Sequence, residues 1–198
     1  MTAELPTLQV IVASTRPGRK GPAVATWFAE QVRQHGKFKA EIADLGVINL
    51  PLLDEPEHPR LRKYQNDHTK SWSARIDRSH AFVFVTPEYN YGTPPPLLNA
   101  LDYLVQEWGY KPAGFVSYGG VSGGLRGVQM TKQVVTALKM VPLVEAVTVP
   151  MFTKFIDPET GVFKPEDVQA QSAAKMLDEL LRWSNALRVL RPPDSPAA

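Results

Sequence analysis

The sequence contains no cysteine, almost no excess of charge and no long hydrophobic run. Without cysteine there is no disulfide, no thiolate nucleophile, no cysteine-ligated zinc and no iron–sulfur cluster. The 22 Lys and Arg residues against 20 Asp and Glu residues leave a formal net charge of +2, which is too small to argue for nucleic acid as a partner. No stretch approaches the ~20 apolar residues that span a bilayer. We therefore expect no nucleic-acid and no membrane partner.

Targeting and metal-binding patterns are absent as well. Residues 1–6 do not show the basic region and apolar run of a secretory signal, so we expect a cytoplasmic protein. The four histidines have neither HxxxH nor HExxH spacing, so we expect no metal site. They are His35, His58, His68 and His80.

What is present is the composition of one folded domain. Of the 198 residues, 43% are hydrophobic and 21% are charged, as in ordinary globular proteins. This length can bury a sizeable core. We expect a single domain over residues 1–190 and a disordered tail over 191–198, which holds three prolines.

Apolar strands alternate with amphipathic helices along the chain. Strands are expected at 8–13, 38–44, 81–85, 113–116 and 143–149. Helices are expected at 22–35, 69–79, 94–108, 125–138 and 166–190, and a long loop at 46–67. The segment 81–85 is apolar at every position, as in a parallel strand covered on both faces. This alternation predicts an α/β fold, a doubly wound five-stranded parallel sheet with helices on both faces.

Three loops of unusual composition follow strands in this arrangement, at 14–21, 87–92 and 117–124. Ligands of such folds bind outside the carboxyl ends of the strands. Because the carboxyl ends of parallel strands lie at one edge of the sheet, we expect the three loops to converge there.

The first loop has the composition of a phosphate site. Unpaired N–H groups of Ala23 and Val24 at the following helix start would point toward the same anion. The loop is neither a Walker loop nor a GxGxxG fingerprint, and a solvated basic turn is the alternative. Its hydroxyl donors and cations are Ser14, Thr15, Arg16, Arg19 and Lys20.

The composition of the other two loops favours binding of a flat ring. Tyr89, Asn90 and Tyr91 could pack against a heteroaromatic ring and bond its polar edge, or else form a tight connection that fills core. The 117–124 loop has four glycines, which allow close approach of the backbone but are also found in merely flexible loops. Glu88 in its polar turn is more consistent with a helix cap or surface group than with a catalytic acid.

Residues 8–150 resemble the NADPH-dependent FMN reductase family, a flavodoxin-like group that includes quinone, chromate and azo-dye reductases. The resemblance rests on LQVIVASTRPGRKGPAVATW, TPEYNYGTPPPLLNALDYL and KPAGFVSYGGVSGGLRGVQ. It implies a flavodoxin-like fold with FMN bound across the three loops. The phosphate contacts would come from Ser14, Arg16, Arg19, Gly21, Ala23 and Val24. The isoalloxazine contacts would come from Pro87, Glu88, Tyr89, Asn90, Ser117, Gly119 and Gly120.

The resemblance also implies an activity. Hydride from NADPH or NADH would pass to bound FMN and on to a small-molecule acceptor such as a quinone or free flavin. Since the flavin carries this chemistry, we expect no catalytic side chain. The alternatives are a flavodoxin-type electron shuttle without nicotinamide activity, and a ligand-sensing protein with a vestigial site. Relatives of this family form homodimers, and we expect at least a dimer here. Its contact would be the cluster of Tyr103, Trp108 and Tyr110 in which the 94–108 helix ends and which we expect to be exposed.

Overall fold

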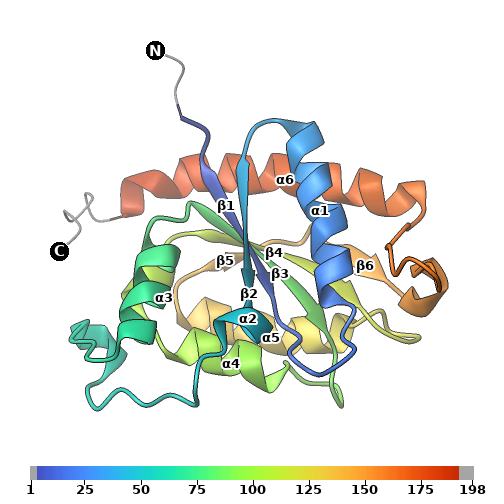
Figure 1. Ribbon diagram of the computed structural model, residues 1–198. Coiled ribbons are helices and arrows are strands. Elements are labelled where there is room, and N and C mark those ends of the chain that lie inside the picture. Colours follow the sequence, from blue (N-terminus) through green and yellow to red (C-terminus); the bar gives the residue numbers. More distant parts are fainter. Residues whose placement is uncertain (1–3, 192–198) are drawn as a thin grey trace.

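The computed structural model describes residues 4–191, and at its centre lies a parallel sheet (Figure 1). The strands have the order β2-β1-β3-β4-β5, and the short β6 also pairs with β4. They are β1 (Thr7–Val12), β2 (Lys39–Asp44), β3 (Ala81–Pro87), β4 (Pro112–Tyr118), β5 (Val141–Pro142) and β6 (Val147–Val149). Every residue of β3 and β4 is buried. The predicted doubly wound sheet is confirmed, and its order is that of flavodoxin-like folds.

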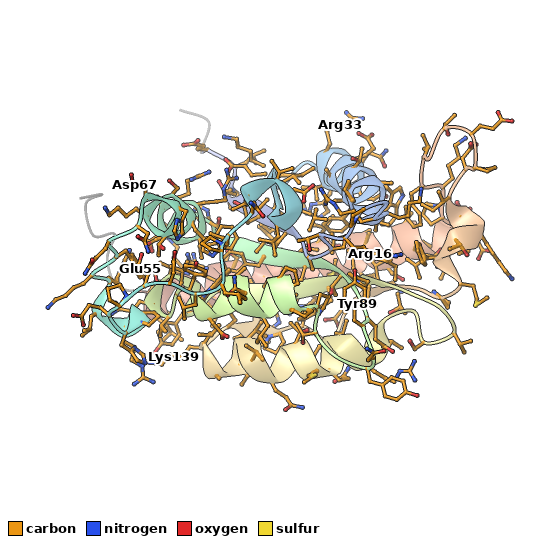
Figure 2. The ribbon with its side chains drawn as sticks, turned by 60° about the horizontal axis from the view of Figure 1, so that its bottom comes forward. Arg16, Arg33, Glu55, Asp67, Tyr89 and Lys139 are labelled. Atoms are coloured by element: carbon orange, nitrogen blue, oxygen red, sulfur yellow. The ribbon has the colours of Figure 1, made fainter. Side chains whose placement is uncertain are left out.

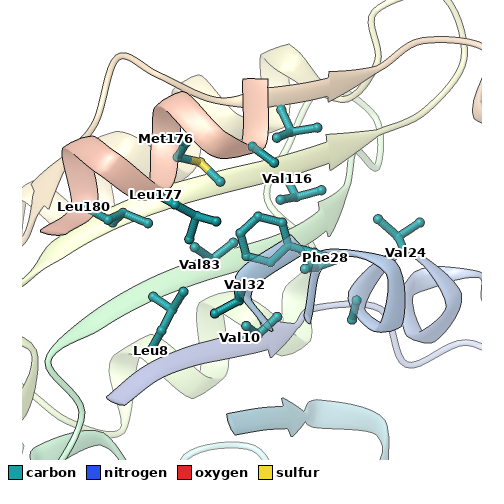
Figure 3. Packing of buried hydrophobic residues seen from close by; sticks show 14 of the residues in the cluster. Leu8, Val10, Val24, Phe28, Val32, Val83, Val116, Met176, Leu177 and Leu180 are labelled. Atoms are coloured by element: carbon teal, nitrogen blue, oxygen red, sulfur yellow. The ribbon is translucent and has the colours of Figure 1, made fainter. Parts of the chain in front are cut away.

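Helices cover both faces of the sheet. They are α1 (Gly21–His35), α2 (Leu45–Ile48), α3 (Asp67–Asp77), α4 (Pro95–Asp102), α5 (Leu125–Ala137) and α6 (Asp167–Leu187). Helices α1 and α6 pack on one face, where Phe28 and Val32 lie against Leu8 and Val10 of β1 (Figure 3). Helices α3, α4 and α5 contribute to the second core, on the other face. No helix within residues 4–191 is long and apolar enough to cross a membrane.

The structure differs from the predicted elements in three places. The expected fifth strand is split into β5 and β6, and Pro142 cannot donate a ladder hydrogen bond at the break. The expected helix over 94–108 ends at Asp102 and is followed by a separate 3-10 turn, Gln106–Trp108. The expected loop over 46–67 overlaps α2 and holds a 3-10 turn, Pro59–Leu61. The predicted tail lies, apart from Arg191, outside the described residues.

The expectation that Tyr103 and Trp108 are exposed is wrong. Both side chains are fully buried in the core beneath α4. The indole of Trp108 donates to the Leu101 carbonyl at 3.2 Å, and the Tyr103 hydroxyl donates to the Pro51 carbonyl and to Asp54, each at 3.0 Å. The Tyr103 hydroxyl therefore fastens the segment after α2 to the domain, and the Trp108 indole bonds to α4, so neither side chain forms an exposed apolar surface.

Candidate cofactor site

The three loops meet at one cavity of about 220 Å³ at the carboxyl edge of the sheet. Strand β3 lies between β1 and β4, so the loops that follow these strands leave the sheet side by side. Figure 2 shows Arg16 of the first loop and Tyr89 of the second at the same end of the molecule. The cavity is lined by Ser14, Arg16, Arg19, Lys20, Pro87, Glu88, Tyr89, Tyr118, Gly119, Gly120 and Phe152.

A buried pair of hydroxyl groups lies at the base of the first loop. The Tyr118 hydroxyl donates to Oγ of Ser14 at 3.2 Å, and both residues are almost completely buried. A Cβ on Gly21 would collide with Oγ of Ser14 and lie 2.9 Å from the Tyr118 hydroxyl, so only glycine fits there. Burial raises the pKa of Tyr118 to about 12, which keeps the phenol protonated at neutral pH.

The three cations of the first loop are not equivalent. Nη1 of Arg19 donates to Oδ1 of Asp44 at 2.6 Å and to the Ser14 carbonyl at 3.1 Å. Arg19 therefore ties the loop to the end of β2, although it also lines the cavity. The side chains of Arg16 and Lys20 are exposed and form no hydrogen bond or ion pair with residues 4–191. These two are the cations left available to an anion.

The start of α1 offers fewer donors than expected. The expectation of a free Val24 amide is wrong, because this N–H donates to the Lys20 carbonyl at 3.3 Å. Among the described residues, the amides of Gly21 and Ala23 have no such backbone acceptor, as usual in a first helical turn. None of the three residues is part of the cavity lining.

The second loop is a tight turn closed by two hydrogen bonds between the backbones of Tyr89 and Gly92. Asn90 and Tyr91 at its tip have φ of 50° and 69°, the left-handed conformation that a type I′ turn requires at both central positions. Pro87, Glu88 and Tyr89 line the cavity, whereas Asn90 is exposed and does not. Tyr91 is exposed too, and the Arg126 guanidinium lies 3.8 Å from the centre of its ring.

Glu88 joins the second loop to the third. Its Oε2 accepts hydrogen bonds from the Arg126 amide (2.9 Å), the Gly127 amide (3.3 Å) and the Ser122 hydroxyl (3.2 Å), and Oε1 pairs with the Arg126 guanidinium at 2.8 Å. Burial acts to raise the pKa of Glu88, but these donors outweigh it and hold the pKa below its usual value. The carboxylate therefore caps α5, as interpreted from the sequence.

The third loop presents backbone to the cavity. A Cβ on Gly120 would meet open space, so this part of the loop is accessible. The carbonyl groups of Gly119 and Gly120 accept from the amides of Phe152 (3.1 Å) and Met151 (2.8 Å), which fastens the segment after β6 beside the loop. Ser117 is buried outside the cavity, and its hydroxyl has no partner within the described part of the chain.

Two lining residues were missed by reasoning from the sequence. Tyr118 lies inside the recognised third loop, and its position directly after a buried strand was the available signal. Phe152 follows β6, and its ring centre lies 5.0 Å from that of Tyr118. No local pattern marks Phe152, because the pairing of β6 with β4 brings it to the cavity.

The lining fits a ligand with a phosphate and a flat ring, two groups that FMN carries. Arg16, Lys20 and Ser14 supply unpaired cations and a hydroxyl at one side. Tyr89 and Phe152 supply aromatic surface, and the open backbone at Gly120 leaves room for a ring. The cavity is smaller than the ~300–1,000 Å³ that is typical of ligand pockets. A bound FMN would therefore extend over the rim of the cavity.

Comparisons with known proteins agree with this chemistry. Residues 6–154 match the family model described as NADPH-dependent FMN reductase. An NAD(P)H-dependent FMN reductase of Schizosaccharomyces pombe is 42% identical over 149 residues, covering 73% of this chain and 74% of that protein. A quinone reductase of Pseudomonas putida is 30% identical over 138 residues, covering 66% and 70%. The solved structure of FerB, a flavoenzyme NAD(P)H:(acceptor) oxidoreductase of Paracoccus denitrificans, superposes with a TM-score of 0.72 at 20% identity, covering 92% and 98%.

Proposed function

The chain belongs to the NADPH-dependent FMN reductase family, and from this premise we infer that it is an FMN-dependent oxidoreductase that takes hydride from NAD(P)H and reduces a small acceptor. FMN supplies the hydride and electron-transfer chemistry when bound. The protein then has to bind the cofactor, orient it and leave one side open to the nicotinamide and the acceptor.

We propose that Arg16, Lys20 and Ser14 hold the FMN phosphate, with the amides of Gly21 and Ala23. Arg19 acts mainly through Asp44, by fixing the loop that carries the other two cations. The observation that supports this assignment best is the pair of unpartnered cations at a cavity lined by three loops far apart in sequence. Cationic side chains that are buried and paired stabilise a fold, whereas exposed and unpaired cationic side chains at a cavity favour binding of a phosphate.

For the ring we propose contacts from the second and third loops. Pro87, Tyr89, Gly119 and Gly120 belong to the cavity lining, and Phe152 joins them. Glu88 contributes through its backbone, since its carboxylate is used by α5. Asn90 and Ser117 lie away from the lining, and a bound ring would reach them only through backbone groups or a shift of the loops.

The acceptor and the setting are also proposals. A quinone or a flavin is supported by the names of the relatives and by aromatic residues at the cavity. We propose a cytoplasmic enzyme, where reduced nicotinamide nucleotides are available. A homo-oligomer of at least two chains is supported by the exposed apolar side chains of Leu98 on α4 and of Leu125 and Met130 on α5. Light scattering that finds only a monomer at working concentration would contradict the oligomer.

The decisive experiment is the visible spectrum of the purified protein, recorded before and after NADPH is added without oxygen. We expect flavin absorption in the starting sample, or after reconstitution with FMN, and rapid bleaching by NADPH. Quinone added next should restore the absorption. Bound flavin that NADPH does not bleach would indicate an electron shuttle, and failure to take up FMN would indicate a vestigial site.

A further inference from the structure

One hydrogen bond at the cavity connects two strands that are not neighbours. Ser14 follows β1 and Tyr118 ends β4, and β3 lies between them in the sheet. The Tyr118 hydroxyl nevertheless reaches Oγ of Ser14, at 3.2 Å. The two residues are 104 positions apart, so the contact links the first loop directly to the third.

This contact determines which hydrogen-bonding groups of the Ser14 hydroxyl remain available to a ligand. A serine hydroxyl has one proton and two lone pairs. The Tyr118 hydroxyl donates a hydrogen bond to Oγ of Ser14, and this bond uses one of the two lone pairs. The Ser14 hydroxyl donates to no acceptor within residues 4–191, and Ser14 lines the cavity. Its proton is therefore left for a ligand atom.

The surroundings hold the pair in place. The absence of a Cβ at Gly21 provides the space in which the two hydroxyl groups meet. On its other side the Tyr118 ring packs against Phe152, with 5.0 Å between the ring centres. Burial keeps the phenol protonated, so it remains a donor throughout the neutral range.

We propose that Tyr118 is a positioning residue for cofactor binding, whose hydroxyl orients the Ser14 hydroxyl as a donor to the FMN phosphate. This inference rests on the proposed function and adds a residue that acts through another. In this role the ring of Tyr118 fills space, and its hydroxyl alone carries the effect on the phosphate. The effect must therefore depend on two things, a phosphate on the ligand and a hydroxyl at Ser14.

The test is a double-mutant cycle read with two ligands. Dissociation constants of FMN and of riboflavin, which lacks the phosphate, are measured by flavin fluorescence quenching on flavin-free protein. We expect Tyr118→Phe to weaken FMN binding about threefold to tenfold, as for the loss of one hydrogen bond, and to leave riboflavin binding unchanged. In the Ser14→Ala background the Tyr118→Phe change should have no further effect.

Several outcomes would overturn the proposal. Equal losses for FMN and riboflavin would assign Tyr118 a structural role only. A loss that persists in the Ser14→Ala background would mean direct contact between Tyr118 and the ligand. Unchanged FMN binding would rule out any orienting effect. If the unmodified protein binds FMN, each of these results contradicts the inference alone, whereas a protein that binds neither flavin contradicts the proposed function as well.

Tyr64→Phe is the matched control. Tyr64 also donates a phenolic hydrogen bond, to Glu107 at 2.8 Å, but it lies outside the cavity. We expect this variant to melt at a lower temperature and to keep the FMN-to-riboflavin affinity ratio of the unmodified protein. A changed ratio in Tyr64→Phe would show that general loosening of the domain produces the signal and would overturn the interpretation.

Discussion

Polar side chains at the amino edge of the sheet are paired within the chain, whereas several at the carboxyl edge are not. At the amino edge, Glu107 is fully buried and accepts hydrogen bonds from Tyr64 (2.8 Å) and Ser73 (2.7 Å). Beside it the buried ammonium of Lys111 donates to the carbonyl groups of Ile76 and Asp77, each at 2.8 Å. At the carboxyl edge, by contrast, the Arg16 and Lys20 side chains line a cavity without a hydrogen-bond or ion-pair partner among residues 4–191. The Ser14 hydroxyl beside them accepts from Tyr118 but has no acceptor of its own there.

This difference separates stability from binding. A polar group that is paired inside the fold contributes to the free energy of unfolding, and its removal leaves buried partners unsatisfied. A polar group that is unpaired at a cavity contributes little to folding and retains its hydrogen-bonding capacity for a ligand. Substitutions at the two edges should therefore change different measurements.

The largest expected effect is at the amino edge, for Glu107→Ala. The substitution removes the acceptor of the buried Ser73 hydroxyl, the shorter hydrogen bond of the half-buried Tyr64 hydroxyl and the ion pair with Nε of Arg62 at 3.3 Å. We expect the free energy of unfolding to fall by about 3 kcal/mol. Urea denaturation measures this, and the FMN affinity should not change. Glu57→Ala, at an exposed glutamate, is the control and should stay within about 0.5 kcal/mol. A Glu107→Ala protein of normal stability would break the comparison.

At the carboxyl edge, Arg16→Ala should have the converse effect. We expect FMN binding to weaken by about 2 kcal/mol, or roughly thirtyfold, through loss of a charge-assisted hydrogen bond to the phosphate. The unfolding free energy of the flavin-free protein should not change, because the Arg16 side chain has no hydrogen-bond or ion-pair partner within residues 4–191. Titration with FMN measures the effect, and Arg60→Ala, at another exposed arginine, is the control. Equal flavin occupancy in Arg16→Ala would refute the assignment.

Lys111, at the amino edge, should make the stability of the protein depend on pH. Burial lowers its pKa to about 7, whereas in the unfolded chain the pKa returns to its ordinary value, ~10.4. Between these values the unfolded chain binds more protons, so stability should rise with pH, by at most ~1.4 kcal/mol per pH unit.

Lys111→Met should flatten this dependence between pH 7 and 9, as followed by urea denaturation at each pH. Lys175→Met, at an exposed lysine, should keep the slope of the unmodified protein. Identical slopes in Lys111→Met and the unmodified protein would show that the buried ammonium does not titrate in this range.

The fold was predictable from the sequence where one local rule decides it. The unbroken apolar run of 81–85 indicated a central strand, and β3 is buried throughout. Pro22 and Gly36 indicated the two ends of α1, and Gly36 does adopt φ of 72° at its C-cap. The split between β5 and β6 was not predictable by pattern alone, because Leu143 and Val147 are both buried although the strand is interrupted between them.

The site was predictable as a set of loops but not as a set of contacts. Parallel topology alone brings the three loops to one edge. Which cation remains free depends on partners distant in sequence, and Asp44, 25 positions after Arg19, takes that guanidinium. The contribution of Phe152 likewise depends on the pairing of β6, which no residue near the loops signals.

The smallest expected effect, at Glu88, tests whether a polar side chain contributes to stability or to binding according to its position in the sheet or according to its pairing within the chain. Glu88 lies at the carboxyl edge, yet its carboxylate is paired like the groups at the amino edge. We expect Glu88→Gln to lower the unfolding free energy by about 1 kcal/mol, since a neutral amide caps α5 less well, and to change FMN affinity less than twofold. Because the pKa of Glu88 is lowered in the fold, its stabilisation is present at neutral pH and is lost as the pH falls through that pKa. Urea denaturation at pH 7 and pH 4 should therefore show a smaller difference for Glu88→Gln than for the unmodified protein. A large loss of FMN affinity with unchanged stability would mean that position at the cavity, and not pairing within the chain, determines what a polar group does.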